Sequence, residues 1–326
     1  MTRKIVLDKK DRRILAALDT NARQSNTAIA KAIGLNKNTV TYKIKRLSDA
    51  GIIQRYYTVI DSARLGYFSM RIYLKFFRTS SDDEDRIIEW LKAQDLVGVV
   101  GRIEMTYDLV FMVWVKSIHE FKAFWNGFKG CFRKYVWQER VHIFSGVLHC
   151  ERAYLDPDRN GQKRNVQEIG GELAPHDTTD LAILSLLADN ARTPLVMIAE
   201  KLQIPARTIA ARIKALERKK IIQGYRVHLN LDALGYVYYK INITLDDFSA
   251  HDTLMEYSKE HEYVIYIDET LAEIDFEVDV EVPRKEGLSA FLTEVKKSFP
   301  IRHVEVLAYD DYLKLKSIPV FDPIGK

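Results

Sequence analysis

The chain has 326 residues, of which 47% are hydrophobic and 29% are charged, so it has room for several small domains with hydrophobic cores. It contains no run of about 18 apolar residues, and its start lacks the apolar segment of a signal peptide, so we expect a cytoplasmic protein without a membrane span. Cys131 and Cys150 have no Cys or His neighbour at metal-ligand spacing, so we expect free thiols rather than a zinc site or a disulfide framework.

The formal net charge of +4 conceals an uneven distribution of charge along the chain. Residues 1–60 carry 13 Lys and Arg against 4 Asp and Glu, and residues 176–230 carry 9 against 5. Residues 231–326 carry 10 against 20. Positive charge gathered in two separate segments is what binding to a polyanion such as DNA requires.

Residues 1–60 are predicted to form a helical domain. Asp8 is placed to cap a first helix, and the stretch 26–53 has the pattern of helix, tight turn and helix. Apolar residues recur at helical spacing on both sides of Gly34, which lies where the chain must turn sharply. Asn36 occupies the N-cap position of the second helix, so the pattern predicts a helix-turn-helix.

The exposed face of that second helix is predicted to carry amide, hydroxyl and cationic groups. Such groups suit the DNA major groove, where base edges offer hydrogen-bonding partners and phosphates attract Lys and Arg. The alternative is an ordinary amphipathic helix with a solvated face, because this pattern matches many helical hairpins. The residues predicted to contact DNA are Asn36, Lys37, Asn38, Thr41, Tyr42, Lys45 and Arg46.

Residues 61–155 change from helical to strand-like patterning. Strands are predicted at 70–77, 98–103, 109–116 and 137–149, with helices at 80–94 and 118–130. This βαββαβ order is that of the ferredoxin-like unit, a four-stranded antiparallel sheet with two helices on one face. The predicted fold class is therefore α+β, with a winged-helix-like domain followed by a ferredoxin-like domain.

The chain then repeats itself. An ungapped shift of 169 residues aligns Asp8 with Asp177, and the Asn-Ala-Arg motif at 21–23 returns at 190–192. We therefore predict a tandem duplication. The predicted domains are helix-turn-helix at 1–60 and 176–230 and ferredoxin-like at 61–155 and 231–326, with a Pro-, Gly- and charge-rich linker at 156–175.

The second recognition helix has fewer groups that could read bases. Ala210, Ala211 and Ala215 occupy positions that carry Thr, Tyr and Arg in the first half. We predict that half one supplies most of the sequence discrimination, while half two contributes more by phosphate contact and position. The residues of half two predicted to contact DNA are Arg207, Thr208, Lys214 and Arg218.

Each half resembles a complete member of the Lrp/AsnC (feast/famine) family of transcription regulators. The matching motifs are Leu-Asp-x-x-Asp-x-x-Ile-Leu at 7–15, Asn-Ala-Arg at 21–23, Arg-Leu-x-x-x-Gly-Ile-Ile at 46–53 and Leu-Gly-Tyr at 65–67. The resemblance implies binding of double-stranded DNA through the helical domain. It also implies dimerisation, and often amino-acid sensing, through the α/β domain. The family ordinarily has one such unit per chain, so the tandem form is a departure.

The resemblance also implies an effector site near the turn between the second and third strands, where the family has Gly close to Tyr-Asp. Half one has Gly101 followed at a longer gap by Tyr107 and Asp108, and half two has no clean match. If the chain binds a small-molecule effector, we expect Gly101, Tyr107 and Asp108 to line its pocket.

The two central strands differ in charge pattern. Residues 109–115 are apolar on both faces, whereas residues 274–282 alternate apolar with acidic side chains. Because a strand that is apolar on both sides is covered on both sides, we expect half one to pack against a second chain in a homodimer. We expect the acidic stripe to be solvated; the alternatives are that it pairs with a basic surface elsewhere or that it repels DNA and wrong partners. The alternative to the homodimer packs the two halves of one chain together as a pseudo-dimer. The acidic residues are Asp275, Glu277, Asp279 and Glu281.

An enzyme is the alternative function. Siroheme decarboxylases resemble the same two-domain unit and have two related halves, with a His-Asn-Tyr-x-Arg pattern ahead of the third strand. The corresponding stretches here lack His, and the eight histidines are scattered along the sequence. No nucleophile–base pair, Gly-rich phosphate loop or metal-ligand spacing appears in the sequence. We therefore predict a DNA-binding regulator that is not an enzyme and needs no cofactor.

Overall fold

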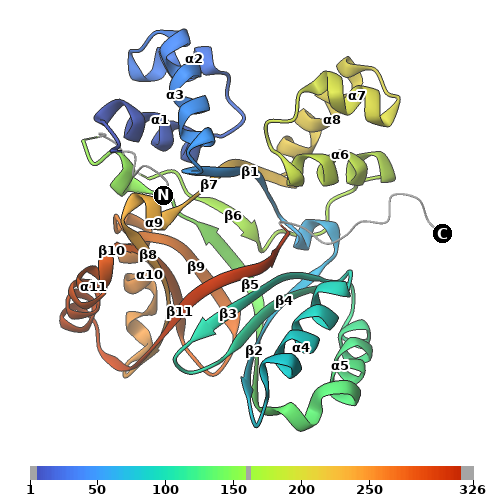
Figure 1. Ribbon diagram of the computed structural model, residues 1–326, viewed down its shortest axis with the longest axis vertical. Coiled ribbons are helices and arrows are strands. Elements are labelled where there is room, and N and C mark those ends of the chain that lie inside the picture. Colours follow the sequence, from blue (N-terminus) through green and yellow to red (C-terminus); the bar gives the residue numbers. More distant parts are fainter. Residues whose placement is uncertain (1–5, 159–162, 317–326) are drawn as a thin grey trace.

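Two three-helix units lie on one side of a ring of β-strands in the computed structural model, which describes residues 6–158 and 163–316 (Figure 1). The first unit consists of α1 (Lys9–Thr20), α2 (Asn26–Ile33) and α3 (Lys37–Asp49). Gly34 ends α2 in the left-handed conformation, with φ 67°, and Asn36 caps α3. The predicted helix-turn-helix is confirmed.

The second unit repeats this arrangement with α6 (Thr178–Asp189), α7 (Leu195–Leu202) and α8 (Ala206–Arg218). Its turn differs, because Gln203 adopts the left-handed conformation that Gly34 adopts in the first unit. Pro205 stands at the N-cap of α8, where it supplies no side-chain hydrogen bond. The second helix-turn-helix therefore forms with a less favourable turn and cap.

The strands that follow the two helical units pair with each other. β1 (Ile53–Ile60) and β7 (Ile222–Leu229) form a two-stranded antiparallel sheet, which we call the ribbon. In its register Arg55 lies opposite His228. The ribbon connects the two helical units across the top of the molecule (Figure 1).

Each half then continues with the predicted βαββαβ order. Half one contains β2 (Phe68–Phe76), α4 (Ser81–Ala93), β3 (Val97–Glu104), β4 (Leu109–Val115), α5 (Ile118–Phe132) and β5 (Val136–His149). Half two contains β8 (Tyr236–Leu245), α10 (His251–Glu260), β9 (Val264–Leu271), β10 (Phe276–Pro283), α11 (Arg284–Ser298) and β11 (Ile301–Leu315). Apolar side chains on one face of each sheet pack with its two helices into a separate core. The predicted α+β class is confirmed.

The segment 156–175, expected to be a linker, contains a short strand. β6 (Val166–Ile169) pairs with the end of β5, and the Gly171 N–H donates to the Asp61 carboxylate at 3.0 Å. A strand of four residues carries too little pattern to be read from sequence. α9 (Leu231–Leu234) connects the ribbon to β8.

Eight strands from the two halves close into a ring. Their order is β2-β4-β3-β11-β8-β10-β9-β5, and β5 pairs back with β2. The halves meet where β3 pairs with β11 and where β5 pairs with β9, both antiparallel. The two halves of one chain therefore pack as a pseudo-dimer. This is the alternative arrangement, in which half one pairs with half two of the same chain, and a homodimer stays a prediction.

The acidic stripe of β10 lies inside the ring, so the expectation of a solvated stripe is wrong. Glu277, Asp279 and Glu281 are 1%, 3% and 2% exposed. Apolar residues alternate with them and face the helices, so the acidic side chains must face inward. Arg71 of half one and Lys240 of the neighbouring strand β8 neutralise these carboxylates. The sequence of β10 alone does not reveal these cations.

Two simpler expectations concern membrane spans and cysteines. Among the helices of the described residues, none is long and apolar enough to cross a membrane. Cys131 is exposed and Cys150 is buried, and both are free thiols, as predicted.

Candidate nucleic-acid interface and interior cavity

The first recognition helix, α3, presents an exposed polar face. Its exposed residues include Lys37, Asn38, Thr41, Tyr42 and Lys45. The Tyr42 side chain is 67% exposed, which is unusual for a large aromatic group on a folded helix. Asn36 has a structural role, because its Oδ1 accepts a hydrogen bond at 2.8 Å from the Asn38 backbone N–H. Amide, hydroxyl and ammonium groups thus lie together on one face of α3.

Arg46 is partly engaged within its own helical unit. Its guanidinium pairs with Asp11 of α1, and its side chain is 33% exposed. Lys43 pairs with the same carboxylate at 2.9 Å and with Asp8 at 2.7 Å. The hydrogen bond from Lys43 lowers the pKa of Asp8 to about 2. These ion pairs fix α3 on α1, so Arg46 is less available to DNA than Lys45.

The second recognition helix, α8, carries mainly cationic groups. Its exposed polar residues include Arg207, Thr208, Lys214 and Arg218. Ala211 is exposed at the position that Tyr42 occupies in the first unit. Arg212 pairs with Asp177 and Asp180 at 2.8 Å each and so repeats the structural role of Lys43. α8 can therefore bind phosphates but has few side chains for base edges.

Reciprocal hydrogen bonds hold the two helical units together. Arg192 Nη1 donates to the Ala22 carbonyl at 2.7 Å, and Arg23 Nη1 donates to the Thr193 carbonyl at 3.1 Å. The backbone N–H groups of Ala22 and Ala191 donate to carbonyls of β7 and β1, at 2.8 and 3.1 Å. We call this set of contacts the clasp. The side-chain donors of the clasp come from the two copies of the Asn-Ala-Arg motif, and nothing in the motif itself reveals this contact.

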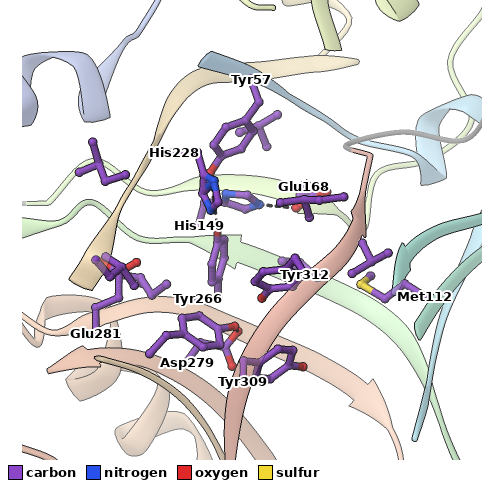
Figure 2. Close-up of a pocket in the computed structure, with 18 of the residues that line it drawn as sticks. Tyr57, Met112, His149, Glu168, His228, Tyr266, Asp279, Glu281, Tyr309 and Tyr312 are labelled. Carbon is purple, nitrogen blue, oxygen red and sulfur yellow. Dashed lines mark hydrogen bonds and ion pairs between the residues drawn. The ribbon is translucent and has the colours of Figure 1, made fainter. Parts of the chain in front are cut away.

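A cavity of about 660 Å³ lies between the ribbon and the ring of strands. Figure 2 shows Tyr57 and His228 on the ribbon side of this space. The labelled residues that the ring strands contribute are Met112, His149, Tyr266, Asp279, Glu281, Tyr309 and Tyr312, and Glu168 comes from β6. A partly polar space of this size fits a small organic ligand.

Arg152 neutralises one side of the cavity. Its Nε and Nη2 donate to the two oxygens of Glu281 at 2.7 and 2.8 Å, and its Nη1 donates to Asp19 at 2.7 Å. Although burial opposes ionisation, the Arg152 and Arg226 cations lower the pKa of Asp19 below its usual value. These charges are therefore satisfied within the protein and are not available to a ligand.

A second cluster joins the two halves inside the ring. Arg71 binds Asp268 at 2.7 Å and Glu277 at 2.9 Å. Lys240 lies 2.6 Å from Asp268 and 2.7 Å from Asp279. Against the effect of burial, the Lys240 and Arg71 cations lower the pKa of Asp268. Both cations of this cluster are thus engaged by carboxylates.

Arg55 and His228 differ from these clusters. Both line the cavity, and Arg55 donates to the Leu315 carbonyl at 3.0 Å with its guanidinium 5.5 Å from the Tyr57 ring centroid. Within residues 6–158 and 163–316, no carboxylate lies at ion-pair distance from Arg55. Burial, followed by the Arg55 and Arg152 cations, lowers the pKa of His228 to about 3, so its ring is neutral at pH 7.

The residues expected to line an effector pocket lie elsewhere. The Tyr107 ring is buried 5.3 Å from the ring of Tyr73, and Asp108 pairs with Lys75 at 2.7 Å. Gly101 lies within β3, paired on both sides. None of Gly101, Tyr107 and Asp108 lines the cavity described above.

The cavity could not be found from the sequence because both halves contribute to its walls. His149 and His228 appear scattered in the sequence, yet both line it. The local sequence places Arg55 close to Tyr57 in a β-prone segment. It does not indicate which residues of the other half lie opposite these two side chains.

Comparison with known proteins supports the assignment of the helical units. A winged helix-turn-helix DNA-binding family model matches residues 7–54 and 176–223. The transcriptional regulator LrpA of Pyrococcus horikoshii is 47% identical over 60 residues, which are 18% of this chain and 43% of LrpA. The regulator Ptr1 of Methanocaldococcus jannaschii is 29% identical over 119 residues, 36% of this chain and 79% of Ptr1. The chain thus spans less than half of LrpA.

Solved structures of the siroheme decarboxylase NirDL are similar to the chain over nearly its whole length. One of them aligns with 97% of this chain and with 95% of the NirDL chain. The TM-score of this alignment is 0.65 and the sequence identity is 13%. At this identity the similarity concerns the fold alone. Two winged helix-turn-helix matches, each followed by an α/β domain, and relatives among the Lrp-type regulators thus make the chain similar to two such regulators in tandem.

Proposed function

We propose that the chain is a sequence-specific DNA-binding transcription regulator with two unequal DNA-binding heads. The heads are the helical units that contain α3 and α8. The observation that carries this proposal is the exposed face of α3, where Asn38, Tyr42 and Lys45 project from a helix-turn-helix. The relatives named as transcriptional regulators support it. On this proposal α3 enters the major groove, where an Asn amide can pair with adenine and Lys can reach guanine or phosphate.

The second head contributes position rather than discrimination. Arg207, Lys214 and Arg218 of α8 are suited to phosphate contacts, which fix register and add salt-dependent affinity. Because the ribbon and the clasp link the heads, both would engage one duplex as a bivalent unit. The operator then need not be a perfect palindrome. Occupancy of promoter DNA would exclude or recruit the transcription machinery, and we propose that a small molecule adjusts it.

The proposal is tested by selecting binding sites from fragmented genomic DNA with the full chain, followed by a salt titration. The selected duplex is compared with a scrambled duplex of the same composition. We expect tighter binding to the selected duplex and an affinity that falls steeply with salt on both. Equal affinity for both duplexes would contradict a sequence-specific regulator and would indicate an architectural DNA-binding protein.

An enzyme related to the siroheme decarboxylases is the second candidate. It is favoured by the likeness of fold to NirDL over 97% of the chain and by the interior cavity. The charges of the cavity weigh against it, because a tetrapyrrole with several carboxylates needs several unpaired cations, whereas Arg71 and Arg152 are already paired. Incubation of the chain with siroheme, with product masses recorded, tests this candidate, and loss of carboxylate groups would establish it.

A further inference from the structure

We propose that the cavity under the ribbon binds a flat small molecule that carries one anionic group, held between Arg55 and His228. The proposal concerns a site that lies away from the expected effector residues Gly101, Tyr107 and Asp108. Its location and ligand class follow from the side chains that line the cavity. Only its regulatory consequence rests on the proposed DNA-binding function.

Arg55 provides the anion-binding end. Its Nε is buried without a hydrogen-bond partner in the described part of the chain, and its Nη1 donates to the neutral carbonyl of Leu315. Among the described residues the nearest acidic influence on this partly buried cation is Asp189, which lies beyond ion-pair distance, so an anion entering the cavity would offset part of the cost of burying the charge. His228, directly opposite in the ribbon, is neutral and can donate one ring N–H to the same anion.

The remaining charges limit the ligand to one anionic group. Glu281 is neutralised by Arg152, and Asp268 by Arg71 and Lys240. Of the other charged lining residues, Asp279 pairs with Lys240 and Glu168 lies against His149, while Asp232, Asp310 and Lys316 are exposed and can be solvated. A second anionic group deeper in the cavity would face carboxylates rather than an unpaired cation.

The body of the ligand would lie among aromatic side chains. Tyr57 and Tyr266 share a hydrogen bond of 3.2 Å between their hydroxyl groups, and the rings of Tyr309 and Tyr312 lie 5.6 Å apart. These tyrosines lie around the cavity, and Met112 lies at the right of the view in Figure 2. Aromatic faces favour a flat, conjugated ligand body, and the hydroxyl groups can orient its polar edges.

The position of the cavity gives the ligand a route to the DNA-binding heads. Arg55 and His228 belong to opposite strands of the ribbon, and each strand follows a recognition helix in the chain. A ligand that binds both strands and the ring would restrain the ribbon. If the heads bind DNA as proposed, this would change the affinity of both heads for one duplex.

The site is tested with the anionic dye 8-anilinonaphthalene-1-sulfonate and the neutral dye Nile red, titrated into the full chain. Arg55→Gln removes the cation, Met112→Trp fills the cavity, and Arg302→Gln changes an exposed arginine outside it. Circular dichroism checks that each variant is folded. Competition with 2-naphthoate and its neutral amide, 2-naphthamide, separates charge from shape.

We expect one saturable site for the anionic dye. Arg55→Gln should weaken it about tenfold while leaving Nile red unchanged, because one charge-assisted hydrogen bond is removed. Met112→Trp should abolish the binding of both dyes, and Arg302→Gln should leave the affinity for each dye unchanged. We expect 2-naphthoate to displace the anionic dye better than 2-naphthamide does. Unchanged dye binding in Met112→Trp would overturn the site, and equal losses of both dyes in Arg55→Gln would overturn the anion assignment.

A final measurement separates this proposal from the proposed function. DNA affinity is measured with and without 2-naphthoate. Dye binding that follows the pattern above, together with no DNA binding in any buffer, would support the ligand site and contradict the regulator. An unchanged DNA affinity at saturating 2-naphthoate would overturn the coupling.

Discussion

Arg23 and Arg192 are equivalent residues of the two repeats, and each donates hydrogen bonds to backbone carbonyls of the other helical unit. Arg192 also donates to the Asn26 side chain at 2.8 Å. These are charge-assisted hydrogen bonds, which are stronger than neutral ones. Together with the ribbon, these hydrogen bonds hold the two helical units at a fixed distance from each other.

Loosening the clasp should weaken bivalent binding. We expect the double variant Arg23→Gln/Arg192→Gln to bind the selected duplex about tenfold more weakly, because the heads lose part of their mutual positioning. Binding to a half-length duplex that accommodates one head should be unchanged. Fluorescence anisotropy measures both, with Arg133→Gln, which lies in the α/β domain, as the control. Equal weakening on the two duplexes would show that the arginines contact DNA directly.

The two recognition helices should contribute differently. Asn38→Ala/Lys45→Ala should reduce the preference for the selected over the scrambled duplex, by about 1–3 kcal/mol for each base that is no longer read. Arg207→Ala/Lys214→Ala should weaken binding to both duplexes similarly and make the salt dependence shallower. Competition titrations at two salt concentrations distinguish the variants. An equal reduction of preference in both variants would contradict the ranking of the heads.

Lys240 should be essential to the stability of the ring. It is 0% exposed and lies within 3.3 Å of three carboxylates, those of Asp268, Glu277 and Asp279. Lys240→Met leaves these carboxylates with Arg71, with His142 beside Glu277 and with the Tyr238 hydroxyl beside Asp279, so we expect the free energy of unfolding to fall by about 3–5 kcal/mol. Urea denaturation measures the change, with the exposed pair variant Lys92→Met as the control. A loss similar to that of the control would show that the acidic stripe is neutralised in another way.

Asp8 should titrate well below an ordinary aspartate. The hydrogen bond from Lys43 lowers its pKa from 3.8 to about 2 in the folded protein. Because the folded pKa is the lower one, the stabilisation is present above pH 3.8 and is lost as the pH falls towards 2. Lys43→Met should move the pKa back towards 3.8, as measured by NMR titration of the carboxyl carbon. Lys37→Met serves as the control, and a pKa unchanged in Lys43→Met would contradict the assigned cause.

Elements with local signals could be predicted from sequence. Asp8 and Asp177 each form a capping box with the Asp three residues later in the chain. Gly34 adopts the left-handed conformation that the turn requires. The βαββαβ order follows from alternating and helical periodicity in each half. The exposed face of α3 could be predicted for the same reason, because helical spacing separates it from the buried Val40 and Leu47.

Features that depend on the pairing of the halves could not be predicted. The hydrogen bond between Arg71 and Glu277 joins residues 206 positions apart, so the alternating charges of β10 look like a solvated face when read alone. The same holds for the ribbon, in which β1 takes its partner from the other repeat. Within half one, the pairing of Arg46 with Asp11 joins two helices, 35 positions apart, so helical spacing alone does not reveal it, and contact of Arg46 with DNA stays a prediction.

The most direct test of a rigid, two-headed reader is the dependence of affinity on the phosphates that lie beside its selected site. Duplexes that keep the base pairs read by α3 are shortened from one end, a few base pairs at a time, and the affinity for each is measured by fluorescence anisotropy. If the ribbon and clasp hold α8 at a fixed distance from α3, affinity should fall in one step when the phosphates under α8 are removed, and Arg207→Ala/Lys214→Ala should abolish that step. An affinity that falls evenly with each shortening would contradict two heads held at a fixed separation.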